Sequence, residues 1–298
     1  MLPEASIATI SRKDAQALMM LLKKVIDTGD SYGISIKNAT DEFLKTKQSG
    51  DLSADTIEGY ELTLKHLGKV IDLEADVSCI TQDTVEKFKD YLQLERRLKK
   101  TGINRRLREL RAISNFCKER GYLSCALIIK EYRVDQTPSY LAEGKLTEIL
   151  DKIMKPELRE YIGLYLSTGA RLNEIYNANL ESDNFLTISA ELSKTRTAIE
   201  IELTHENVII YKKLMKSGLS SSRLSRLFKI ACKAAGHPEF HFHNLRHTAA
   251  IMELIRSKDI YHVSRMLHHS SVKTTEQSYL VHSKRRLKAD FPSLYNAE

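Results

Sequence analysis

Apolar residues recur every three or four positions along most of the sequence, and this pattern restricts the chain to a largely helical fold. In the first half, stripes with this spacing run through segments that open at Thr40, Ser53, Thr81 and Thr101. Because this spacing collects the apolar side chains on one face of a helix, each segment predicts an amphipathic helix. The hydroxyl side chain at each start can cap its helix. We therefore expect four helices within residues 38–122.

One segment, residues 184–204, departs from the helical spacing. Its apolar positions include Ile188, Leu192, Ile199, Ile201 and Leu203, which largely alternate with polar residues as in a half-buried strand. Helical spacing precedes this segment, from near Leu146 and from near Pro156, and returns after it in residues 206–215, 221–235, 243–257, 259–267 and 272–280. The expected fold class is mainly α, with one small antiparallel β-sheet in the second half.

A loss of helical periodicity between residues 123 and 145, with Pro138 and Gly144, divides the chain. A shorter apolar stripe in residues 11–27 predicts a helix before the first domain. The expected organisation is an N-terminal extension with one helix (1–33), a helical first domain (34–125), a linker (126–145), a second domain (146–282) and a tail (283–298).

The composition favours a polyanionic partner, because 46 Lys and Arg residues against 39 Asp and Glu residues give a net charge of +7. No apolar run reaches the length of a membrane span, and the N-terminus does not resemble a secretory signal. The cysteines form no CxxC pair and no Cys/His metal spacing; they are Cys79, Cys117, Cys125 and Cys232. We expect a cytoplasmic protein with free thiols, no membrane contact, no metal and no other cofactor.

Basic residues gather just before and within the segment that opens at Thr101. The arginines of this segment lie largely off its apolar stripe, so they form either a solvated helix face or a surface that contacts phosphates. The basic residues that precede them favour phosphate contacts. The candidate DNA-binding residues are Arg96, Arg97, Lys99, Lys100, Arg105, Arg106 and Arg108.

Four segments of the second domain carry residues suited to phosphoryl transfer: STGARLNEI with Arg171, SKTRT with Lys194, HNLRH with His243 and Arg246, and MLHHSSVKTTEQSYL with His269 and Tyr279. Two guanidinium groups can grip one phosphate, because their forked donors match its oxygens and they keep their charge. A tyrosine hydroxyl becomes a nucleophile where cations favour its phenolate, and a lysine or histidine can move protons. Fixed cations of this kind require no metal.

Together these motifs resemble those of the tyrosine recombinase (phage integrase) family over about residues 38–282. The matching residues are Thr168, Gly169, Arg171 and Glu174; Lys194 in SKT; His243, Arg246, His247 and Thr248; and Leu267, His269, Ser270, Ser271, Thr274, Thr275 and Tyr279. NRRLRELRAISNF also resembles the last helix of the family's core-binding domain. The resemblance implies a helical, SAM-like core DNA-binding domain followed by an α-rich catalytic domain with a small antiparallel sheet.

The resemblance also implies the roles of the site residues. Arg171 and Arg246 clamp the scissile phosphate, Lys194 protonates the leaving 5′ oxygen, His243 assists proton transfer, His269 bonds a phosphate oxygen and Tyr279 forms a 3′-phosphotyrosyl bond. The implied function is strand exchange between two specific sites in double-stranded DNA, by a tetramer on DNA that is monomeric when free, without metal or ATP. A type IB topoisomerase and a non-catalytic DNA-binding regulator are the alternatives.

The sequence departs from the family pattern at two points. His268 replaces the glycine that usually precedes the histidine, and the interval from His269 to Tyr279 is one residue longer than the commonest spacing. His268 is an alternative to His269 as the phosphate ligand. We expect Glu174 to be a structural partner of nearby basic groups, and we expect structural roles for His237, His241 and His247.

The tail combines basic residues with large apolar ones, Leu287, Phe291, Leu294 and Tyr295. A tail that frayed in solvent would have little need of these apolar groups. We expect it to dock on a neighbouring subunit and to couple active sites, with local packing on its own subunit as the alternative.

Overall fold

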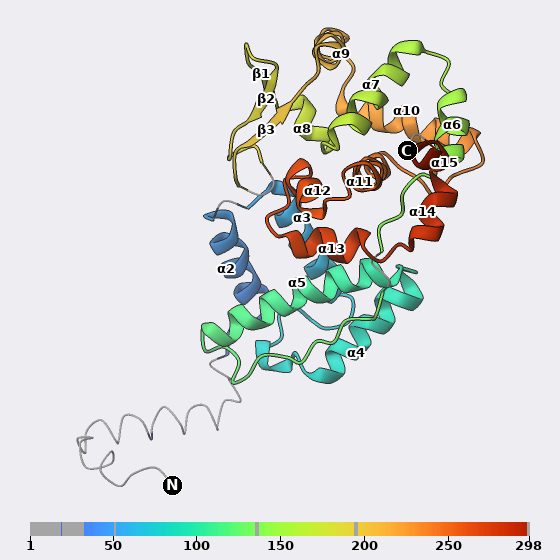
Figure 1. Cartoon of the computed structure of the whole chain (residues 1–298). Helices are drawn as coiled ribbons and strands as arrows, with labels where there is room; N and C mark the ends of the chain where they lie inside the picture. Colours follow the sequence, from blue (N-terminus) through green and yellow to red (C-terminus); the bar gives the residue numbers. More distant parts are fainter. Residues whose placement is uncertain (1–18, 20–32, 51, 135–136, 194–195, 297–298) are drawn as a thin grey trace. The chain divides into compact units, whose positions relative to one another are not determined.

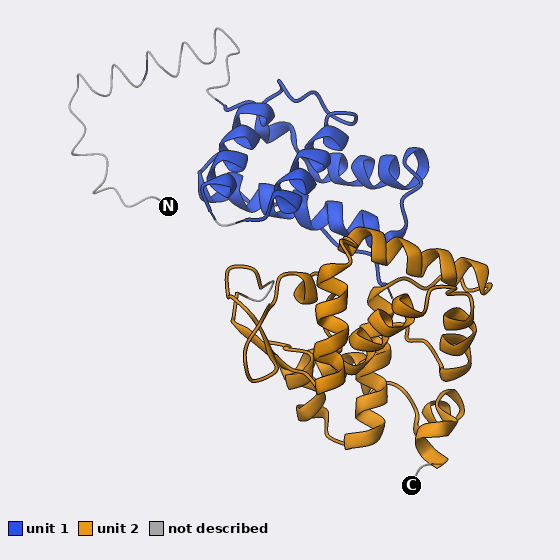
Figure 2. Ribbon diagram, turned by 90° about the horizontal axis from the view of Figure 1, so that it is seen from above, with its two compact units in different colours: residues 1–135 blue, residues 136–298 orange. Residues whose placement is uncertain are grey.

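The computed structural model describes residues 19, 33–50, 52–134, 137–193 and 196–296, and Figure 1 labels the helices and strands. The chain divides into two compact units, residues 1–135 and 136–298 (Figure 2). The helix expected in residues 11–27 lies outside the described residues except for position 19. None of the described helices is both long enough and apolar enough to cross a membrane. The domain limits proposed from the sequence stay predictions.

The first unit consists of packed helices, and the four expected ones are present. They are α2 (Ile36–Gln48), α3 (Ala54–Leu67), α4 (Gln82–Asp90) and α5 (Lys100–Glu119), with a 3-10 turn η2 (Val77–Cys79) and a π-helical turn η3 (Tyr91–Glu95). Their apolar stripes meet in one core around Phe43, Leu67, Phe88 and Leu107. The fold of this unit therefore follows directly from the helical spacing in the sequence.

The helix starts in this unit partly differ from those expected. Thr81 caps α4 as predicted, since its hydroxyl accepts the Thr84 N–H at 3.4 Å. The expectation for Thr40 was wrong, because α2 begins earlier and Ser35 accepts the Asn38 N–H at 3.2 Å. The expected start at Thr101 lies one residue inside α5, which begins at Lys100.

The second unit is mainly helical and contains one small sheet. Its helices are α6 (Glu143–Asp151), α7 (Pro156–Thr168), α8 (Leu172–Tyr176), α9 (His205–Lys216), α10 (Ser221–Ala234), α11 (His243–Ser257), α12 (Ile260–Met266), α13 (Val272–Tyr279), α14 (Lys284–Asp290) and α15 (Pro292–Asn296). Within this unit the sheet lies at one edge and α6 at the opposite side (Figure 1). The expected mainly α fold with a small antiparallel sheet is confirmed.

The sheet has the strand order β1 (Asn179–Leu180), β2 (Phe185–Ile188) and β3 (Ile199–Glu202), all antiparallel. On β3 the expected alternation is present, because Ile199 and Ile201 are buried while Glu200 and Glu202 are exposed. The strand character expected as far as Leu192 was wrong, since β2 ends at Ile188 and the Leu192 side chain is exposed. The two-residue strand β1 is too short to give a periodic signal in the sequence.

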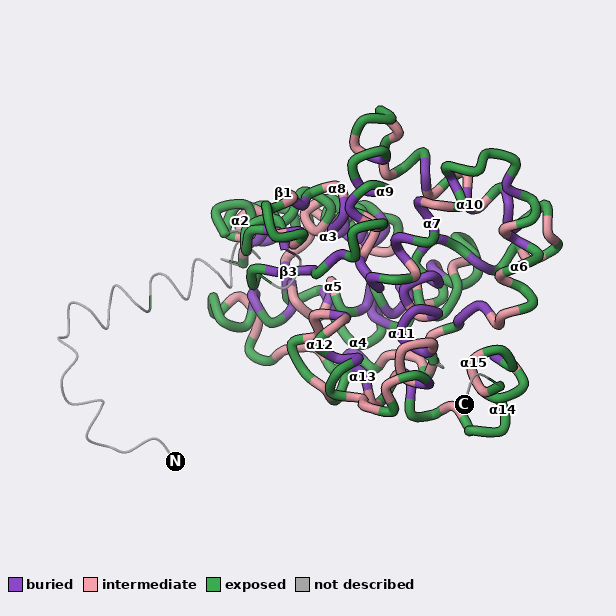
Figure 3. The backbone as a smooth tube through the Cα atoms, turned by 45° about the horizontal axis from the view of Figure 1, so that its top comes forward, coloured by how far each residue is buried: buried purple, intermediate pink, exposed green. Residues whose placement is uncertain are grey.

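Helix α11 is central to the second unit, because it packs against α7, α12 and α15. Buried and exposed residues alternate along most helices, as amphipathic helices require (Figure 3). One large core lies around α7 and the sheet. A separate buried cluster, which we call the tyrosine cluster, consists of Tyr140, Ala250, Ile251, Ile255, Val263, Leu267, Tyr279, Leu287 and Phe291.

The tail packs on its own unit, which is the alternative raised from the sequence, and docking on a neighbouring subunit stays a prediction. Leu287 and Phe291 are members of the tyrosine cluster and are only 6% and 2% exposed. The Tyr140 hydroxyl donates to Asp290 Oδ2 at 2.6 Å and anchors α14. The physical reason is that the apolar groups of the tail complete a core that α11 and α12 leave open, so local packing satisfies them.

Candidate active site

Arg171 is positioned by a sharp turn between α7 and α8. Gly169 ends α7 with a left-handed backbone (φ +63°). A Cβ atom at Gly169 would lie 2.9 Å from Met266 Cε, the end of a flexible side chain that can move aside, so the left-handed backbone is the main reason for glycine there. The chain then leaves the turn with Arg171 as the residue that precedes α8.

Glu174 joins the two candidate phosphate-binding arginines. Its carboxylate accepts the Arg171 backbone N–H at 2.7 Å and the Arg171 guanidinium at 2.5 Å. The Nη1 atom of Arg246 lies 3.6 Å from Glu174 Oε2. The expected structural role of Glu174 is thus confirmed. Because two guanidinium groups share one carboxylate, the group of three carries a net positive charge.

Arg246 is held rigidly inside the protein on the first turn of α11. Its side chain is 3% exposed and donates to the carbonyl oxygens of Gly169, at 2.9 Å, and of Leu267. Burial, and next the charge of Arg171, lower the pKa of Arg246 to about 10, so the guanidinium stays charged at neutral pH. An anion that reaches such a buried cation stabilises its charged form.

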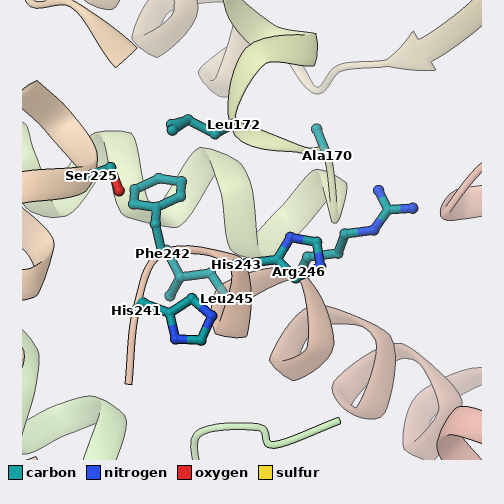
Figure 4. Close-up of a pocket in the computed structure, with 8 residues that line it drawn as sticks. All are labelled: Ala170, Leu172, Ser225, His241, Phe242, His243, Leu245 and Arg246. Carbon is teal, nitrogen blue, oxygen red and sulfur yellow. The ribbon is translucent and has the colours of Figure 1, made fainter. Parts of the chain in front are cut away.

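A pocket of about 200 Å³ opens beside Arg246. His243, the first residue of α11, lines it together with His241, Phe242 and Ser225. In Figure 4 the Arg246 side chain extends away from Phe242 and Ser225. His243 is exposed, so solvent reaches its side chain.

His268 and His269 form the turn that ends α12. His268 adopts a left-handed backbone (φ +49°), and its N–H donates to Arg265 O at 2.9 Å. The His269 N–H donates to Ser264 O at 3.1 Å, which completes a Schellman motif. A glycine is favoured at the left-handed position of such a turn, so the usual family glycine at this place has a backbone reason.

His269 interacts electrostatically with the two arginines and forms a hydrogen bond with α13. Its Nδ1 atom lies 2.8 Å from Thr275 Oγ1. Burial, then the charges of Arg246 and Arg171, lower the pKa of His269 to about 4. The imidazole is therefore neutral at pH 7 and can donate a single N–H to an anion.

Tyr279 is the last residue of α13 and lies in the tyrosine cluster with only 2% of its surface exposed. Burial raises the pKa of its hydroxyl to about 12, although the charges of Arg246 and Arg171 oppose that effect. Its Oη atom lies 2.9 Å from His247 Nδ1. The hydroxyl is thus a buried, un-ionised phenol in this chain.

The sequence analysis did not anticipate the contact between His247 and Tyr279. The ring of His247 meets the ring of His243 edge-on, with centroids 4.8 Å apart. Burial, then the charge of His243, lower the pKa of His247 to about 3. Its position four residues after His243, on the same face of α11, is the signal that would have placed it here.

The structure brings together Arg171, His243, Arg246, His269 and Tyr279, from four separate segments of the second unit. Lys194 lies in the connection between β2 and β3 but outside the described residues. Over the part of the chain that the structure describes, no group of three or more His, Cys, Asp or Glu residues is arranged to hold a metal ion.

Most of the candidate DNA-binding residues of the first unit lie at its surface. Six of them are exposed, namely Arg96, Arg97, Lys99, Lys100, Arg105 and Arg108. The last two also form ion pairs, Arg105 with Glu109 and Arg108 with Glu131, both at 3.1 Å. Both arginines are about half exposed, 53% and 54%, while their glutamates are 13% and 27% exposed.

Arg106 differs from the other candidates, because its side chain is buried in the first unit. It donates to Gly59 O at 2.6 Å, to Thr63 Oγ1 at 3.0 Å and to Glu109 Oε2 at 2.8 Å. Position 106 follows Ile103 by three residues, so it lies on the inner face of α5. With its donors engaged inside the protein, Arg106 is not a phosphate contact.

Comparison with known proteins places the chain in a family. The sequence matches the phage integrase family over residues 139–286 and the phage integrase SAM-like domain over residues 35–130. It is 22% identical to a tyrosine recombinase XerC of Corynebacterium glutamicum, over 80% of this chain and 85% of the relative. It is 24% identical to a tyrosine recombinase XerC of Caldanaerobacter subterraneus subsp. tengcongensis, over 90% of this chain and 86% of the relative.

Solved structures share the fold. A lambda integrase dimer bound to a COC′ core site matches with a TM-score of 0.69 and 18% identity, over 82% of this chain and 95% of that one. XerH bound to a palindromic difH substrate matches with a TM-score of 0.57 and 16% identity, over 86% of this chain and 83% of that one. The two domain matches, the clustered site residues and the shared fold agree: this chain belongs to the phage integrase family and is a tyrosine recombinase.

Proposed function

We propose that the chain cleaves and rejoins DNA through Tyr279 and so exchanges strands between two specific sites in double-stranded DNA. The observation that carries this proposal is the pairing of Arg171 and Arg246 on the single carboxylate of Glu174, next to a buried tyrosine. The geometry and the charge together suit one phosphodiester, as the following steps argue.

A phosphodiester satisfies the charge of this site. Two guanidinium groups and one carboxylate leave a net charge of +1, and the neighbouring imidazoles of His247 and His269 are neutral because their pKa values are lowered. A DNA phosphate with one negative charge restores balance and offers oxygen atoms to both guanidinium forks. In a site with little water this attraction is stronger than at the surface.

The chemical step follows the family pattern. The Tyr279 Oη atom attacks the scissile phosphorus, the bond to the 5′ oxygen breaks, and a 3′-phosphotyrosyl bond forms. Lys194 gives a proton to the leaving 5′ oxygen, and His243 takes part in moving the phenol proton. Arg171, Arg246 and His269 hold the non-bridging oxygens. The 5′ hydroxyl of a second strand then reverses the reaction, so no external energy source is needed.

DNA and further copies of this chain are the proposed partners. The lambda integrase structures that share the fold are a dimer on a core site and a tetramer on a Holliday junction, the latter with a TM-score of 0.67. By analogy we propose a tetramer on two DNA sites. In the first unit, Arg96, Arg97 and Lys99 are exposed and suit the DNA backbone.

A nicked suicide substrate tests the function. The nick lets the short leaving strand diffuse away, so the covalent complex accumulates and is retained on a denaturing gel. We expect a complex with the wild-type chain, formed also in EDTA, and none with Tyr279→Phe, which should still bind DNA. A covalent band of equal intensity from Tyr279→Phe would move the nucleophile to another residue.

A further inference from the structure

The contact between His247 and Tyr279 has no part in the proposed phosphoryl transfer. We propose that His247 is a positioning residue that holds Tyr279 in a buried resting position while DNA is absent, and this inference rests on the proposed role of Tyr279 as nucleophile. The chain would thereby keep its nucleophile out of solvent until a substrate arrives.

The geometry joins two elements that must separate for catalysis. His247 lies on α11, which also carries Arg246, and Tyr279 ends α13. The distance of 2.9 Å between Nδ1 and Oη is that of a normal hydrogen bond. Tyr279 is 2% exposed and Arg246 is 3% exposed, so the site must open before either group meets the phosphate of an external duplex. Reaching the phosphate requires Tyr279 to leave the tyrosine cluster and the contact to break.

The protonation state of His247 follows from its surroundings. Charged and titratable groups near it are His241 and His243, Arg246 on its own helix and His269 from the end of α12. Burial and these groups keep the pKa of His247 low, so its ring is neutral and one ring nitrogen is an acceptor. Burial keeps the Tyr279 phenol un-ionised, so in either tautomer of the neutral ring the contact joins two uncharged partners. The contact therefore holds the un-ionised hydroxyl of Tyr279 in its buried position.

The chain that follows Tyr279 allows the movement. Leu280 and Val281 are each 57% exposed and lie in the short connection before α14. Leu287 and Phe291 are buried and keep the tail docked. Tyr279 can thus swing out about this connection without the tail leaving its site. The cost that opposes the movement is the lost burial of the ring together with the hydrogen bond to His247.

Chemical modification of the full chain without DNA measures this restraint. Tetranitromethane nitrates accessible tyrosines, and mass spectrometry of peptides gives the rate at each position. Tyr261, 62% exposed, is the internal reference for a reactive residue. We expect Tyr279 to be protected in the wild type and to react about tenfold faster in His247→Leu, the effect of leaving one buried hydroxyl without its partner. His247→Asn, which retains a polar group near the place of Nδ1, should restore most of the protection.

Tyr140 is the matched control, because it lies in the same cluster but pairs with Asp290 instead of His247. If His247→Leu only loosens the packing, Tyr140 and Tyr279 will become reactive together, and the proposal is overturned. Unchanged protection of Tyr279 in His247→Leu also overturns the proposal. A failure of His247→Asn to protect Tyr279 from nitration overturns it as well. A rise confined to Tyr279, with rescue by Asn, supports it.

A second measurement needs no change at His247. In ¹⁵N spectra of histidine side chains, the Nδ1 resonance of His247 should shift in Tyr279→Phe, because that variant removes the hydroxyl partner and keeps the aromatic ring. An unshifted Nδ1 resonance would contradict the hydrogen bond. Both measurements are made without DNA, so they are separate from the proposed function, which fails only if Tyr279→Phe still forms the covalent complex.

Discussion

Two buried arginines in this molecule, Arg106 in the first unit and Arg246 in the second, show how similar burial can serve structure or chemistry. Both donate to backbone carbonyl oxygens and both lie near a glutamate. Arg106 pairs with Glu109 at 2.8 Å, and its other donors reach Gly59 and Thr63. Arg246 shares Glu174 with a second arginine.

The difference lies in how far solvent reaches the second arginine of each cluster. Glu109 also pairs with Arg105, but Arg105 is 53% exposed, so solvent screens the extra positive charge in the first unit. At Arg246 two cations face one carboxylate beside neutral histidines and a tyrosine. Burying an unbalanced charge is costly, and a protein retains it where a ligand supplies the missing charge. In the second cluster Arg171 is 24% exposed and Arg246 is 3% exposed, and this buried excess of positive charge identifies the cluster as a candidate site for an anion.

The largest effect should come from Arg246. Arg246→Ala removes a fixed donor to the charge that develops on the phosphate, so cleavage of the suicide substrate should slow by about 10²–10³-fold. Arg246→Lys should also cleave slowly, since a point charge cannot replace the fork. Binding of DNA, measured by gel shift, should weaken much less. Normal cleavage by Arg246→Lys would show that the forked geometry is unnecessary.

The matching change in the first unit should affect stability and leave the chemistry intact. Arg106→Ala leaves Glu109 and the Gly59 carbonyl with fewer donors, so the free energy of unfolding should fall by about 2 kcal/mol. Urea unfolding measures this, with Arg108→Ala as the exposed control, for which we expect a change below about 0.5 kcal/mol. Cleavage by the folded fraction of Arg106→Ala should match the wild type. A specific loss of cleavage would place Arg106 in the active machinery.

The neutral histidines near Arg246 should make the folded protein less stable in acid. The pKa of His247 is lowered to about 3 and that of His269 to about 4, below an unfolded value of about 6.5. Below pH 6.5 the unfolded chain therefore binds protons that the folded chain does not, and stability falls as the pH decreases. Each group contributes up to about 1.4 kcal/mol per pH unit. His247→Asn should lose less stability than the wild type between pH 7.5 and pH 5.5; equal losses would contradict the low pKa.

The smallest expected effect concerns the turn that carries His269. His268 has a left-handed backbone, which costs a side-chain-bearing residue about 1–2 kcal/mol more than glycine. His268→Gly relieves this strain but gives the unfolded chain more freedom, so we expect a net gain of about 0.5–1 kcal/mol in the free energy of unfolding. Thermal unfolding measures the gain, and a loss would show that the His268 side chain itself stabilises the site.

Much of the fold was predictable because helical spacing is a local property of the sequence. The expected segments from 206 to 280 correspond closely to α9, α10, α11, α12 and α13. The wrong expectations come from features that spacing does not report. Leu94 is apolar but 69% exposed, because the π-helical turn η3 changes the direction of successive side chains. The cap of α2 was misplaced for a similar reason, since its start depends on the bridge between Ser35 and Asp76.

The candidate site was predictable as a set of residues, but not as a set of contacts. Arg171 and Arg246 were named from motifs, and the carboxylate that they share could be expected from Glu174. His247 and Tyr279 lie 32 positions apart in the sequence and on different helices, so spacing along one helix cannot indicate the hydrogen bond between them. The burial of Arg106 was missed because a charged residue on an apolar face looks polar in the sequence until its partners are known.

The most direct test of the account is to identify the residue that becomes attached to DNA. The covalent complex trapped on a nicked suicide substrate is digested with protease and nuclease, and the modified peptide is sequenced by mass spectrometry. The account predicts one nucleotide-bearing peptide, with the phosphate on Tyr279 at the end of α13 and beside the unbalanced pair of Arg171 and Arg246. A phosphate attached to any other residue, or no attachment under conditions in which the chain exchanges strands, would contradict it.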